Sequence, residues 1–345
     1  MKTTKMKGVL LINLGSPDST KTKDVRKYLD EFLMDERVID IPFWKRWLLI
    51  KGIILNVRPK KSAAAYKKIW WKEGSPLVVI SGRFAKKVAN NTEIPVALAM
   101  RYGSMSIKKG FEELVMKGVD EILIVPLYPH FAMSSTETVL VKAEEIRKEF
   151  YPNIKTTEIP HFYNEPRYIK VMSDNIKNHL KSFDYDHILF SYHGIPERHI
   201  LKTDPTKNHC KIDGSCCEKP SIAHKTCYRH QCFETTKEIA KQLKLKKGTY
   251  SNSFQSRLLK DPWLKPYTDF EFDRIPKEEG KRKMAVVTPA FVSDCLETLE
   301  EIAMEGKEQF LEGGGTDYKH IPCMNDNDDW VKVMNTWIDE WVAGS

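Results

Sequence analysis

The sequence predicts an α/β protein built from two similar, doubly wound domains, each with a parallel sheet that helices flank on both faces. Its 345 residues, at roughly 150 residues per domain, predict two domains. Short apolar runs rich in β-branched residues alternate with segments of helical length. Near-continuously apolar strands that alternate with helices are typical of a parallel sheet buried on both faces.

The expected elements fall into two sets. The strands are expected at residues 8–14, 94–100, 121–127, 186–192, 249–254 and 284–288, and the main helices at 106–117, 134–150, 166–182, 233–245 and 294–310. A break near residues 155–165 separates the sets. It predicts an N-terminal Rossmann-like domain at 1–160 and a C-terminal one at 161–327. Whether a last helix within 328–345 packs back on the first domain or on the second stays open.

Composition excludes several classes of protein. The net charge is +8, but acidic and basic residues are interspersed, which excludes a histone-like tail. The longest apolar stretch, residues 47–57, contains Lys51 and is about half the length of a membrane-spanning helix. The first apolar run ends at a Gly-Ser-Pro turn without a cleavage site, so we expect a first strand and a cytoplasmic chain.

Ligands of open parallel sheets bind beyond the carboxyl ends of the strands. The residues that follow the expected strands include aromatic rings and one histidine, His193, and the last long helix carries a row of carboxylates. No segment matches a GxGxxG fingerprint or a Walker A loop, so nothing in the sequence indicates nucleotide binding.

Glu297, Glu301 and Glu305 recur at four-residue spacing and so share one face of the expected helix. One interpretation is a solvated face on which Asp294 and Glu297 cap the helix. The other is a cation site, because like charges on adjacent turns repel and oxygen ligands suit a divalent metal. Spacing alone leaves both open.

His193 directly follows a strand of the buried type and is flanked by Gly194 and Pro196. A histidine in this position is often a hydrogen-bonded structural residue. Its pKa range also suits it to accept a proton near pH 7, and the glycine leaves room for a flat ligand.

Ordered motifs over nearly the whole chain resemble the ferrochelatase family, whose members insert Fe²⁺ into porphyrin. The matching segments are VLLINLGSPDS near the start, RPKKSAAAYKKIWWKEGSPL at 58–77, MRYG at 100–103, VPLYPHFAMSSTET at 125–138, SYHGIPERH at 191–199, SFQSR and DPWLKPYTD up to residue 269, and PAFVSDCLETLEEIAMEGKEQFLEGGG at 289–315. The resemblance implies two chelatase-type domains with a porphyrin cleft between them, and insertion of Fe²⁺ into protoporphyrin IX as the last step of haem synthesis.

The resemblance also implies the catalytic residues. His193 corresponds to the histidine that accepts pyrrole protons or handles the metal at the ring centre, and Glu297 to its carboxylate partner. Glu301 and Glu305 resemble the acidic row that leads metal to the site or protons from it. The division of proton and metal roles between His193 and Glu297 stays open.

Further matches imply the porphyrin contacts. Arg101 and Tyr102 correspond to residues that meet a propionate and the ring face, and a guanidinium suits a carboxylate. Asp294 is expected to orient His193 by a hydrogen bond. The remaining expected wall residues are Leu14, Tyr128, Ser134, Gln255, Trp263, Phe291 and Ser293.

A basic, aromatic segment lies at residues 41–61. From residue 41 to 72 there are nine Lys or Arg residues and no acidic residue, interleaved with Trp, Phe, Leu and Ile. The segment is either an ordinary amphipathic helix packed on the domain or a peripheral membrane contact. Because it matches the lip of the family's active site, we favour reversible contact with the inner face of the cell membrane. Nothing else indicates a nucleic-acid partner.

Five of the seven cysteines crowd into residues 210–232, and an insertion at about 207–227 departs from the common family pattern. Clustered cysteines in a cytosolic chain favour a metal over disulfides. Some ferrochelatases carry a 2Fe-2S cluster, and in one bacterial subgroup all ligands lie in an internal segment. We therefore expect a 2Fe-2S cluster on Cys210, Cys217, Cys227 and Cys232, because the adjacent Cys216 and Cys217 do not easily ligate together.

Two alternatives for this insertion remain open. A structural zinc could take His209, His224 or His230 in place of a thiolate, and a disordered loop of incidental thiols would hold no metal. Met133 occupies the position of a cluster cysteine in animal enzymes, so that version is excluded.

Three other functions stay open from the sequence. The substrate could be coproporphyrin III, the protein could be a haem-binding iron-sulfur sensor without turnover, or it could be a cobalt or sirohydrochlorin chelatase. No heptad or interface helix indicates an oligomeric state.

Overall fold

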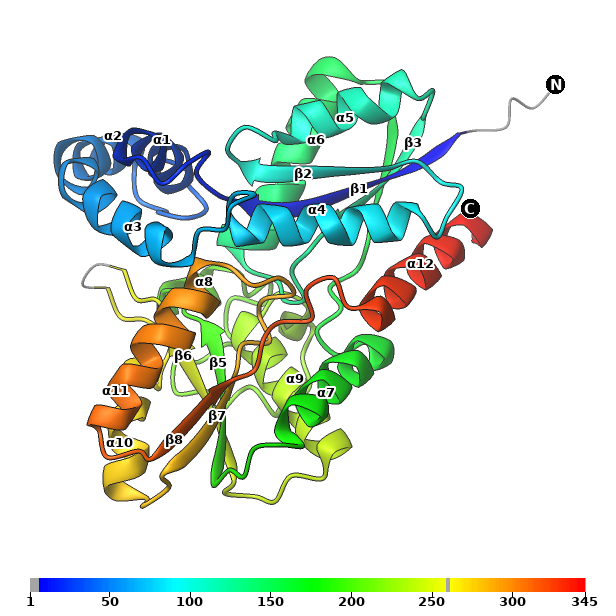
Figure 1. Cartoon of the computed structure of the whole chain (residues 1–345). Coiled ribbons are helices and arrows are strands. Elements are labelled where there is room, and N and C mark those ends of the chain that lie inside the picture. Colours follow the sequence, from blue (N-terminus) through cyan, green and yellow to red (C-terminus); the bar gives the residue numbers. More distant parts are fainter. Residues whose placement is uncertain (1–5, 259–260, 345) are drawn as a thin grey trace. The chain divides into compact units, whose positions relative to one another are not determined.

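The computed structural model describes residues 6–258 and 261–344, which form two compact units (Figure 1). Unit 1 comprises Met1–Tyr128, Met133–Pro160 and Asn325–Ser345, and unit 2 comprises Pro129–Ala132 and His161–Met324. The chain passes between the units after Tyr128, Ala132, Pro160 and Met324.

Each unit contains a four-stranded, fully parallel sheet. In unit 1 the strands β1 (Lys7–Gly15), β2 (Val96–Tyr102), β3 (Glu121–Pro126) and β4 (Lys155–Glu158) lie in the order β2-β1-β3-β4. In unit 2 the strands β5 (His187–His193), β6 (Tyr250–Gln255), β7 (Lys283–Val287) and β8 (Asp317–His320) lie in the equivalent order β6-β5-β7-β8. The predicted fold class is confirmed, and the repeated order makes the two sheets alike.

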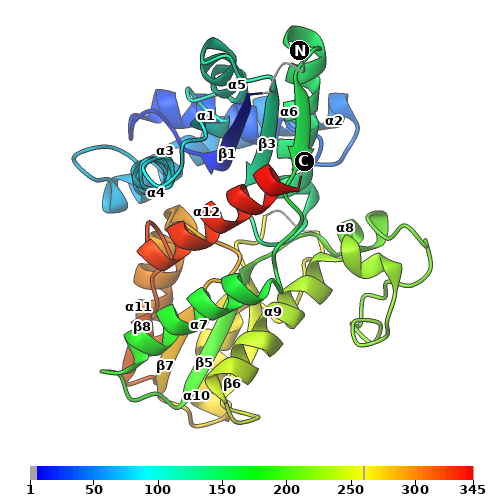
Figure 2. The ribbon, with the colours of Figure 1, turned by 90° about the vertical axis from the view of Figure 1, so that its right-hand side faces the viewer.

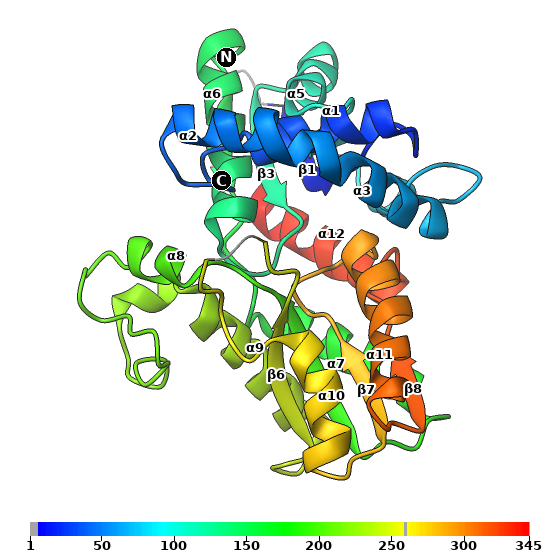
Figure 3. The ribbon, with the colours of Figure 1, turned by 90° about the vertical axis from the view of Figure 1, so that its left-hand side faces the viewer.

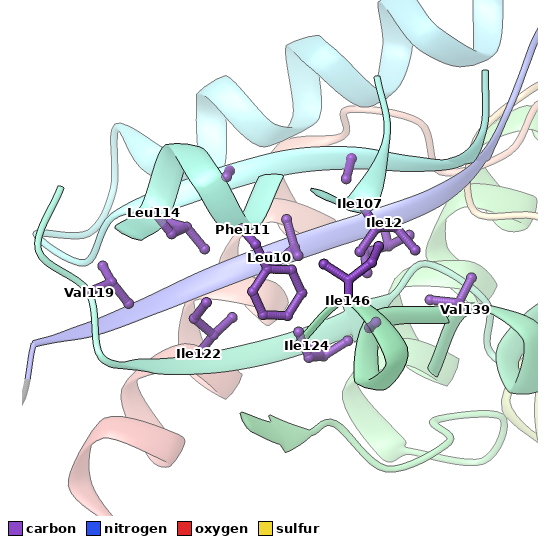
Figure 4. Packing of buried hydrophobic residues seen from close by; sticks show 13 residues of the cluster. Leu10, Ile12, Ile107, Phe111, Leu114, Val119, Ile122, Ile124, Val139 and Ile146 are labelled. Carbon is purple, nitrogen blue, oxygen red and sulfur yellow. The ribbon is translucent and has the colours of Figure 1, made fainter. Parts of the chain in front are cut away.

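Two sets of helices cover the sheet of unit 1. Helices α5 (Ile107–Met116) and α6 (Thr138–Phe150) pack on alternate side chains of β1, β2 and β3 in the core shown in Figure 4. On the opposite face, α4 (Pro76–Ala89) meets α12 (Asp328–Ala343), where the rings of Phe84 and Trp330 stack with centroids 5.8 Å apart. The C-terminal helix therefore lies in unit 1.

A helical segment leads from β1 to α4. Helix α1 (Thr22–Leu33) lies beside α3 (Leu55–Ile69), which α2 (Phe43–Trp47) and the π-helical Leu48–Ile54 precede (Figure 3). Ile50, Ile54 and Leu55 are buried, so one face of this segment packs on the unit.

In unit 2, α10 (Thr268–Glu278), the π-helical Glu297–Gly306 and α11 (Lys307–Glu312) pack on one face of the sheet. Helices α7 (Pro166–Leu180) and α9 (Tyr228–Leu243) contact each other on the other face. Helix α8 (Glu197–Lys202) and the cysteine-containing segment with the 3₁₀ turn Ile222–Lys225 project to one side of this unit (Figure 2).

This strand order locates the expected ligand site. The connections from β5 and from β7 leave on opposite sides of the sheet, and ligands of open parallel sheets bind at such a point, beyond the carboxyl ends of the strands. His193 ends β5, and the segment from Thr288 to Glu297 follows β7.

Candidate active site

His193 lies at the carboxyl end of β5, opposite Gln255 of β6. Its Nδ1 atom is buried and has no hydrogen-bond partner among the residues that the structure describes. Burial lowers the pKa of His193, although the nearby charge of Glu297 raises it. The imidazole is therefore neutral at pH 7 and can accept a proton.

Backbone contacts fix the turn after His193. The amide of Gly194 donates to the carbonyl of Gln255 at 2.8 Å, and the hydroxyl of Tyr228 donates to the carbonyl of His193 at 2.8 Å. A Cβ atom at residue 194 would lie 2.7 Å from the Gln255 carbonyl oxygen, closer than a side chain can approach. Only glycine fits this position, and it holds the histidine at the edge of β6.

The acidic row lies on a π-helix instead of the expected α-helix. Its i→i+5 hydrogen bonds widen the turn beyond the 3.6 residues of an α-helix, and such turns are frequent at functional sites. Glu297 begins the π-helix, and its carbonyl accepts from Nε2 of Gln255 at 3.2 Å. Glu305 is exposed. The row thus runs from the neighbourhood of His193 to the protein surface.

Glu301, the middle member of the row, is held by Ser256 directly after β6. The Ser256 amide donates to Oε1 of Glu301 at 2.8 Å, and the Ser256 hydroxyl donates to Oε2. The pKa of Glu301 is raised to about 7. Burial and the charges of Glu297 and Glu305 raise it, and the two hydrogen bonds from Ser256 offset part of this rise. This carboxyl group can therefore exchange a proton near neutral pH.

Asp294 is held at the start of the π-helix, and its expected contact with His193 stays a prediction. Its Oδ1 atom accepts from the Thr298 hydroxyl at 2.8 Å and from the Cys323 amide at 3.3 Å. The side chain therefore secures the start of the π-helix, where it is only 4% exposed. The ring of Phe291, in contrast, meets His193 edge-on with centroids 6.0 Å apart.

Other predicted wall residues of unit 2 are largely buried. Oε1 of Gln255 accepts from the Ser191 hydroxyl at 2.7 Å, and Nε1 of Trp263 donates to the Leu258 carbonyl at 2.8 Å. Ser293 is 4% exposed. Hydrogen bonds and burial thus fix these side chains around the end of β5.

The predicted porphyrin residues of unit 1 also gather at strand ends. Arg101 and Tyr102 end β2, Leu14 lies near the end of β1, Tyr128 follows β3, and Ser134 lies in the π-helical turn Met133–Glu137. The expected residues thus form one group in each unit. The single cleft expected between the domains stays a prediction.

Arg101 and Tyr102 share a buried carboxylate that sequence reasoning missed. Asp35 accepts from Nη2 of Arg101 at 2.5 Å and from the hydroxyl of Tyr102 at 2.9 Å. The hydroxyl of Thr138 and the amide of Arg37 also donate to Asp35. Although burial opposes it, these hydrogen bonds and the charge of Arg101 keep the pKa of Asp35 below its usual value.

Neither Asp35 nor Ser256 carried a strong sequence signal. Asp35 stands in an unremarkable run, MDERVID, far from Arg101 in the chain. Ser256 stands in the quoted SFQSR motif, and its position directly after an expected strand was the one available sign.

Comparison with known proteins decides the family. A family model described as Ferrochelatase matches residues 6–341. The chain belongs to the ferrochelatase family. It is 46% identical to the ferrochelatase of Opitutus terrae, covering 98% of this chain and 99% of the relative, and 47% identical to that of Pseudomonas fluorescens strain Pf0-1, covering 95% and 96%. The expected family is confirmed.

The fold is that of another chelatase. The solved structure of SirB from Bacillus subtilis with Fe³⁺ superposes with a TM-score of 0.55 at 9% sequence identity, covering 97% of this chain and 95% of that chain. The sirohydrochlorin chelatase SirB from the subspecies spizizenii, in complex with cobalt, gives a TM-score of 0.54.

In this ferrochelatase the cysteine insertion is an ordered part of unit 2. The buried carboxylate of Asp204 accepts from the amides of His209 and Cys210 at 2.9 and 2.8 Å. Although burial opposes it, the hydrogen bonds to Asp204 lower its pKa to about 2. These contacts argue against a disordered loop.

All five clustered cysteines are buried and unlinked. The thiols of Cys210 and Cys217 both lie within hydrogen-bonding reach of Cys227, and Cys216 acts electrostatically on Cys210. Cys232 lies further along α9, where it contacts Tyr228 and acts electrostatically on Tyr168 and Tyr192. Cys217 also acts electrostatically on Cys232, so all five buried thiols lie in one region of unit 2.

Histidines surround these thiols. The rings of His224 and His230 stack with centroids 3.5 Å apart, and His209 meets His224 edge-on at 5.4 Å. Within residues 6–258 and 261–344, no group of three or more His, Cys, Asp or Glu side chains has the arrangement of a metal site.

The segment at residues 41–61 has two faces. The Arg46 guanidinium is buried and donates to the carbonyls of Ile39 and Ile41. The opposite face exposes six large apolar side chains by 47–72%: Phe43, Trp44, Trp47, Leu48, Ile53 and Val57. No helix among the described residues is long and apolar enough to cross a membrane.

Proposed function

We propose that this protein inserts Fe²⁺ into protoporphyrin IX to form protohaem, with His193 and Glu297 at the reacting centre. Membership of the ferrochelatase family supports metal insertion into a porphyrin. One observation carries the assignment of residues. Nδ1 of the neutral His193, at the end of β5, accepts or donates no hydrogen bond among the described residues, and the charge of Glu297 acts on this imidazole.

The chemistry requires a proton acceptor beside the ring. Free protoporphyrin carries two pyrrole N–H protons, and both must leave as the metal binds the four nitrogens. His193 accepts one proton at a time because its lowered pKa keeps it neutral, and the carboxylate of Glu297 stabilises the imidazolium that forms. The first proton leaves along the carboxylate row to solvent, and the neutral imidazole then accepts the second. The ring of Phe291 limits the orientation of the imidazole.

The carboxylates on the π-helix connect this centre to solvent. Glu305 is exposed and Glu301 is partly buried, so an ion or a proton can pass between Glu305 and Glu297 through one intermediate group. Three oxygen-bearing side chains in a row bind a divalent cation weakly enough to release it. Because the pKa of Glu301 lies at about 7, that group alternates between acid and carboxylate at working pH.

Residues of unit 1 recognise the rest of the porphyrin. The guanidinium of Arg101 pairs with a propionate, and Asp35 holds that guanidinium in place through its own ion pair. Leu14, Tyr128 and Ser134 contribute wall contacts from neighbouring strand ends.

An anaerobic assay tests this proposal. Purified protein is mixed with protoporphyrin IX and Fe²⁺ while the loss of free-porphyrin absorbance is followed, beside the variants His193→Ala and Glu297→Gln. Both variants should lose at least about 100-fold in kcat, the usual contribution of a positioned acid or base, while still binding porphyrin. Metallation by His193→Ala at the parent rate would refute the role of this residue.

The same assay separates the alternative substrates. Protoporphyrin IX should give a higher kcat/KM than coproporphyrin III, because the SYHGIP and CLETLEEI motifs resemble the protoporphyrin branch. A preference for coproporphyrin III, or for cobalt and sirohydrochlorin, would reassign the substrate. Porphyrin binding without metallation by the parent protein would favour a sensor.

We also propose that the cysteine insertion holds a 2Fe-2S cluster on Cys210, Cys217, Cys227 and Cys232. The supporting observation is that the folded segment carries five buried, unlinked thiols. The donor chemistry fits, because thiolates are the ligands of such clusters. When bound, the cluster would supply a one-electron redox centre and cross-link the insertion to α9.

Metal analysis of anaerobically purified protein tests the cluster. We expect coloured protein with about two iron and two acid-labile sulfide per chain. Cys232→Ser should lose the cluster, whereas Cys216→Ser, the matched control in the same segment, should keep it. The reverse result would move the fourth ligand to Cys216, and colourless protein with one bound zinc would refute the cluster.

We further propose that the protein works in the cytoplasm and contacts the inner face of the membrane through residues 41–61. Six exposed apolar side chains accompany exposed Lys45, Lys60 and Lys61 on this segment. Such a surface favours the headgroup region of anionic lipid, with each cation near it contributing about 1 kcal/mol.

Co-sedimentation with vesicles that contain an anionic phospholipid tests this contact. The double variant Trp44→Ala/Trp47→Ala should weaken binding, and raising the salt concentration should weaken it further. Met116→Ala is the matched control, because Met116 is 82% exposed on α5. Equal binding by both variants would refute the assigned segment.

A further inference from the structure

Two buried tyrosine hydroxyls hold the ends of the two strands that lead into the candidate active site. The hydroxyl of Tyr228, the first residue of α9, donates to the carbonyl of His193 at 2.8 Å. The hydroxyl of Tyr168, in the first turn of α7, donates to the carbonyl of Pro289 at 3.0 Å. Tyr228 is 5% exposed and Tyr168 is 0% exposed. Helices α7 and α9, which contact each other, thus each reach the end of one strand.

The Tyr228 hydroxyl acts where strands β5 and β7 part. Parallel pairing between these strands ends at Phe190 and Val287. The Gly194 amide donates toward β6, and the N–H and C=O bonds of one peptide group point in opposite directions, so the His193 carbonyl points to the side on which β7 lies. A buried carbonyl needs a partner, and the hydroxyl takes the place that a strand amide fills elsewhere in the sheet.

The segment after β7 carries the other half of the site. Pro289 lies two residues beyond the end of β7, and the amide of Phe291 closes a turn by donating to the carbonyl of Thr288 at 3.1 Å. The ring of Phe291 meets His193 edge-on, and the segment continues to Glu297 at the start of the π-helix. A shift of the Pro289 carbonyl would therefore move a ring that lies against the histidine.

Burial and ring packing make each hydroxyl a fixed donor. Burial raises the pKa of the Tyr168 and Tyr228 phenols well above its usual value, so neither group loses its proton near neutral pH. The ring of Tyr228 meets the His130 ring edge-on with centroids 5.9 Å apart, and the ring of Tyr168 meets Phe162 edge-on at 5.2 Å. Because a tyrosine side chain has few rotatable bonds, a packed ring holds its hydroxyl at a constant place.

We propose that Tyr228 and Tyr168 are positioning residues that set the spacing of the groups at the reacting centre. Tyr228 acts on the backbone of His193. Tyr168 acts on the segment that carries Phe291 and leads to Glu297. The inference rests on the proposed roles of His193 and Glu297 in iron insertion. A displacement of about 1 Å in a reacting group can cost about 100-fold in rate, so these two bonds should affect the rate of the reaction more than the binding of porphyrin.

Iron insertion by variants of the full chain tests the proposal. Tyr228→Phe and Tyr168→Phe each remove one hydroxyl and keep the packed ring. Each should lower kcat about tenfold, the cost of a shift of about half an ångström, while the KM and the Kd for protoporphyrin IX stay within about twofold. Tyr192→Phe is the matched control and should keep the parent kcat. The Tyr192 hydroxyl is also buried, but it bonds to the side chain of Thr236, at 2.7 Å, instead of to a backbone carbonyl.

A His193→Ala background separates positioning from general packing. In that background Tyr228→Phe should leave the residual rate nearly unchanged, because the side chain that the hydroxyl positions is gone. The midpoint of urea denaturation is measured for every variant, so that rates are compared between folded proteins.

Each outcome decides a separate point. A parent-like kcat in Tyr228→Phe or Tyr168→Phe would overturn the role of that tyrosine. An equal loss in Tyr192→Phe, or an undiminished loss from Tyr228→Phe in the His193→Ala background, would overturn positioning in favour of general packing. Undiminished metallation by His193→Ala alone, or no metallation by the parent, would refute the proposed function first, and the inference would fail with it.

Discussion

Ser256→Ala should move the acid limb of the pH–rate profile to higher pH. The Ser256 hydroxyl donates to Oε2 of Glu301, and its loss leaves only the amide bond at 2.8 Å to stabilise the carboxylate. A hydrogen bond to a charged group contributes about 1.5–3 kcal/mol, and one pKa unit corresponds to about 1.36 kcal/mol. The pKa of Glu301, now about 7, should therefore rise by about one to two units.

The sign and size of the kinetic effect follow from ionisation. A carboxylate is ionised above its pKa, so at pH 7 the ionised fraction of Glu301 should fall from about half to about a tenth or less. If the row works in its ionised form, kcat/KM at pH 7 should fall at least roughly fivefold, and it should recover as the pH rises by one to two units above 7.

The assay is iron insertion measured from pH 5.5 to 9.5 under anaerobic conditions. Glu301→Gln provides the matched background, because Ser256→Ala should have no further effect on the profile once the titrating group is gone. An acid limb that stays in place in Ser256→Ala, or moves to lower pH, would refute the reasoning. An equal shift in both backgrounds would assign it to another group.

Three further outcomes concern stability. Gly194→Ala should cost about 1–3 kcal/mol in urea denaturation, because the new Cβ would lie 2.7 Å from the Gln255 carbonyl oxygen, and an unchanged midpoint would contradict this packing. Asp35→Asn should cost about 3–5 kcal/mol, since it leaves the guanidinium of Arg101 without its anion, and a loss below about 1 kcal/mol would argue against a buried pair. Burial lowers the pKa of His130 to about 3. Between pH 6.5 and about 3 the unfolded chain therefore binds a proton that the folded chain does not, and the free energy of unfolding should fall by about 1.4 kcal/mol for each unit that the pH is lowered. The variant His130→Gln should show a smaller dependence on pH.

The sequence predicted much of this fold because local pattern and burial agree along the central strands. β1, β2, β3, β5, β6 and β7 were expected within a few residues of their observed bounds, since most of them carry apolar side chains on both faces. The edge strands β4 and β8, with the sequences KTTE and DYKH, were not predicted. A short polar strand at the edge of a sheet has no apolar signature, and pairing with its neighbour creates it.

The sequence likewise predicted some features of the candidate active site and missed others. His193 and the glutamate row were predictable because they directly follow buried strands or repeat at a fixed spacing. The π-helical form of that row was not predictable. A π-helix has a slightly wider turn than an α-helix, and this difference leaves little trace in the spacing of apolar residues. The expected hydrogen bond from Asp294 to His193 stays a prediction, and the sequence did not predict that Oδ1 of Asp294 accepts from the Thr298 hydroxyl and the Cys323 amide.

The sequence by itself determined the class of fold, the family and the types of chemical group that this protein brings to its ligands. Motif and periodicity are properties of neighbours in the chain. Tertiary structure alone decided the partners of those groups: Asp35 for Arg101 and Ser256 for Glu301. The physical reason is that the charge of a buried group depends on what lies within a few ångströms in space, and distance along the chain does not record it.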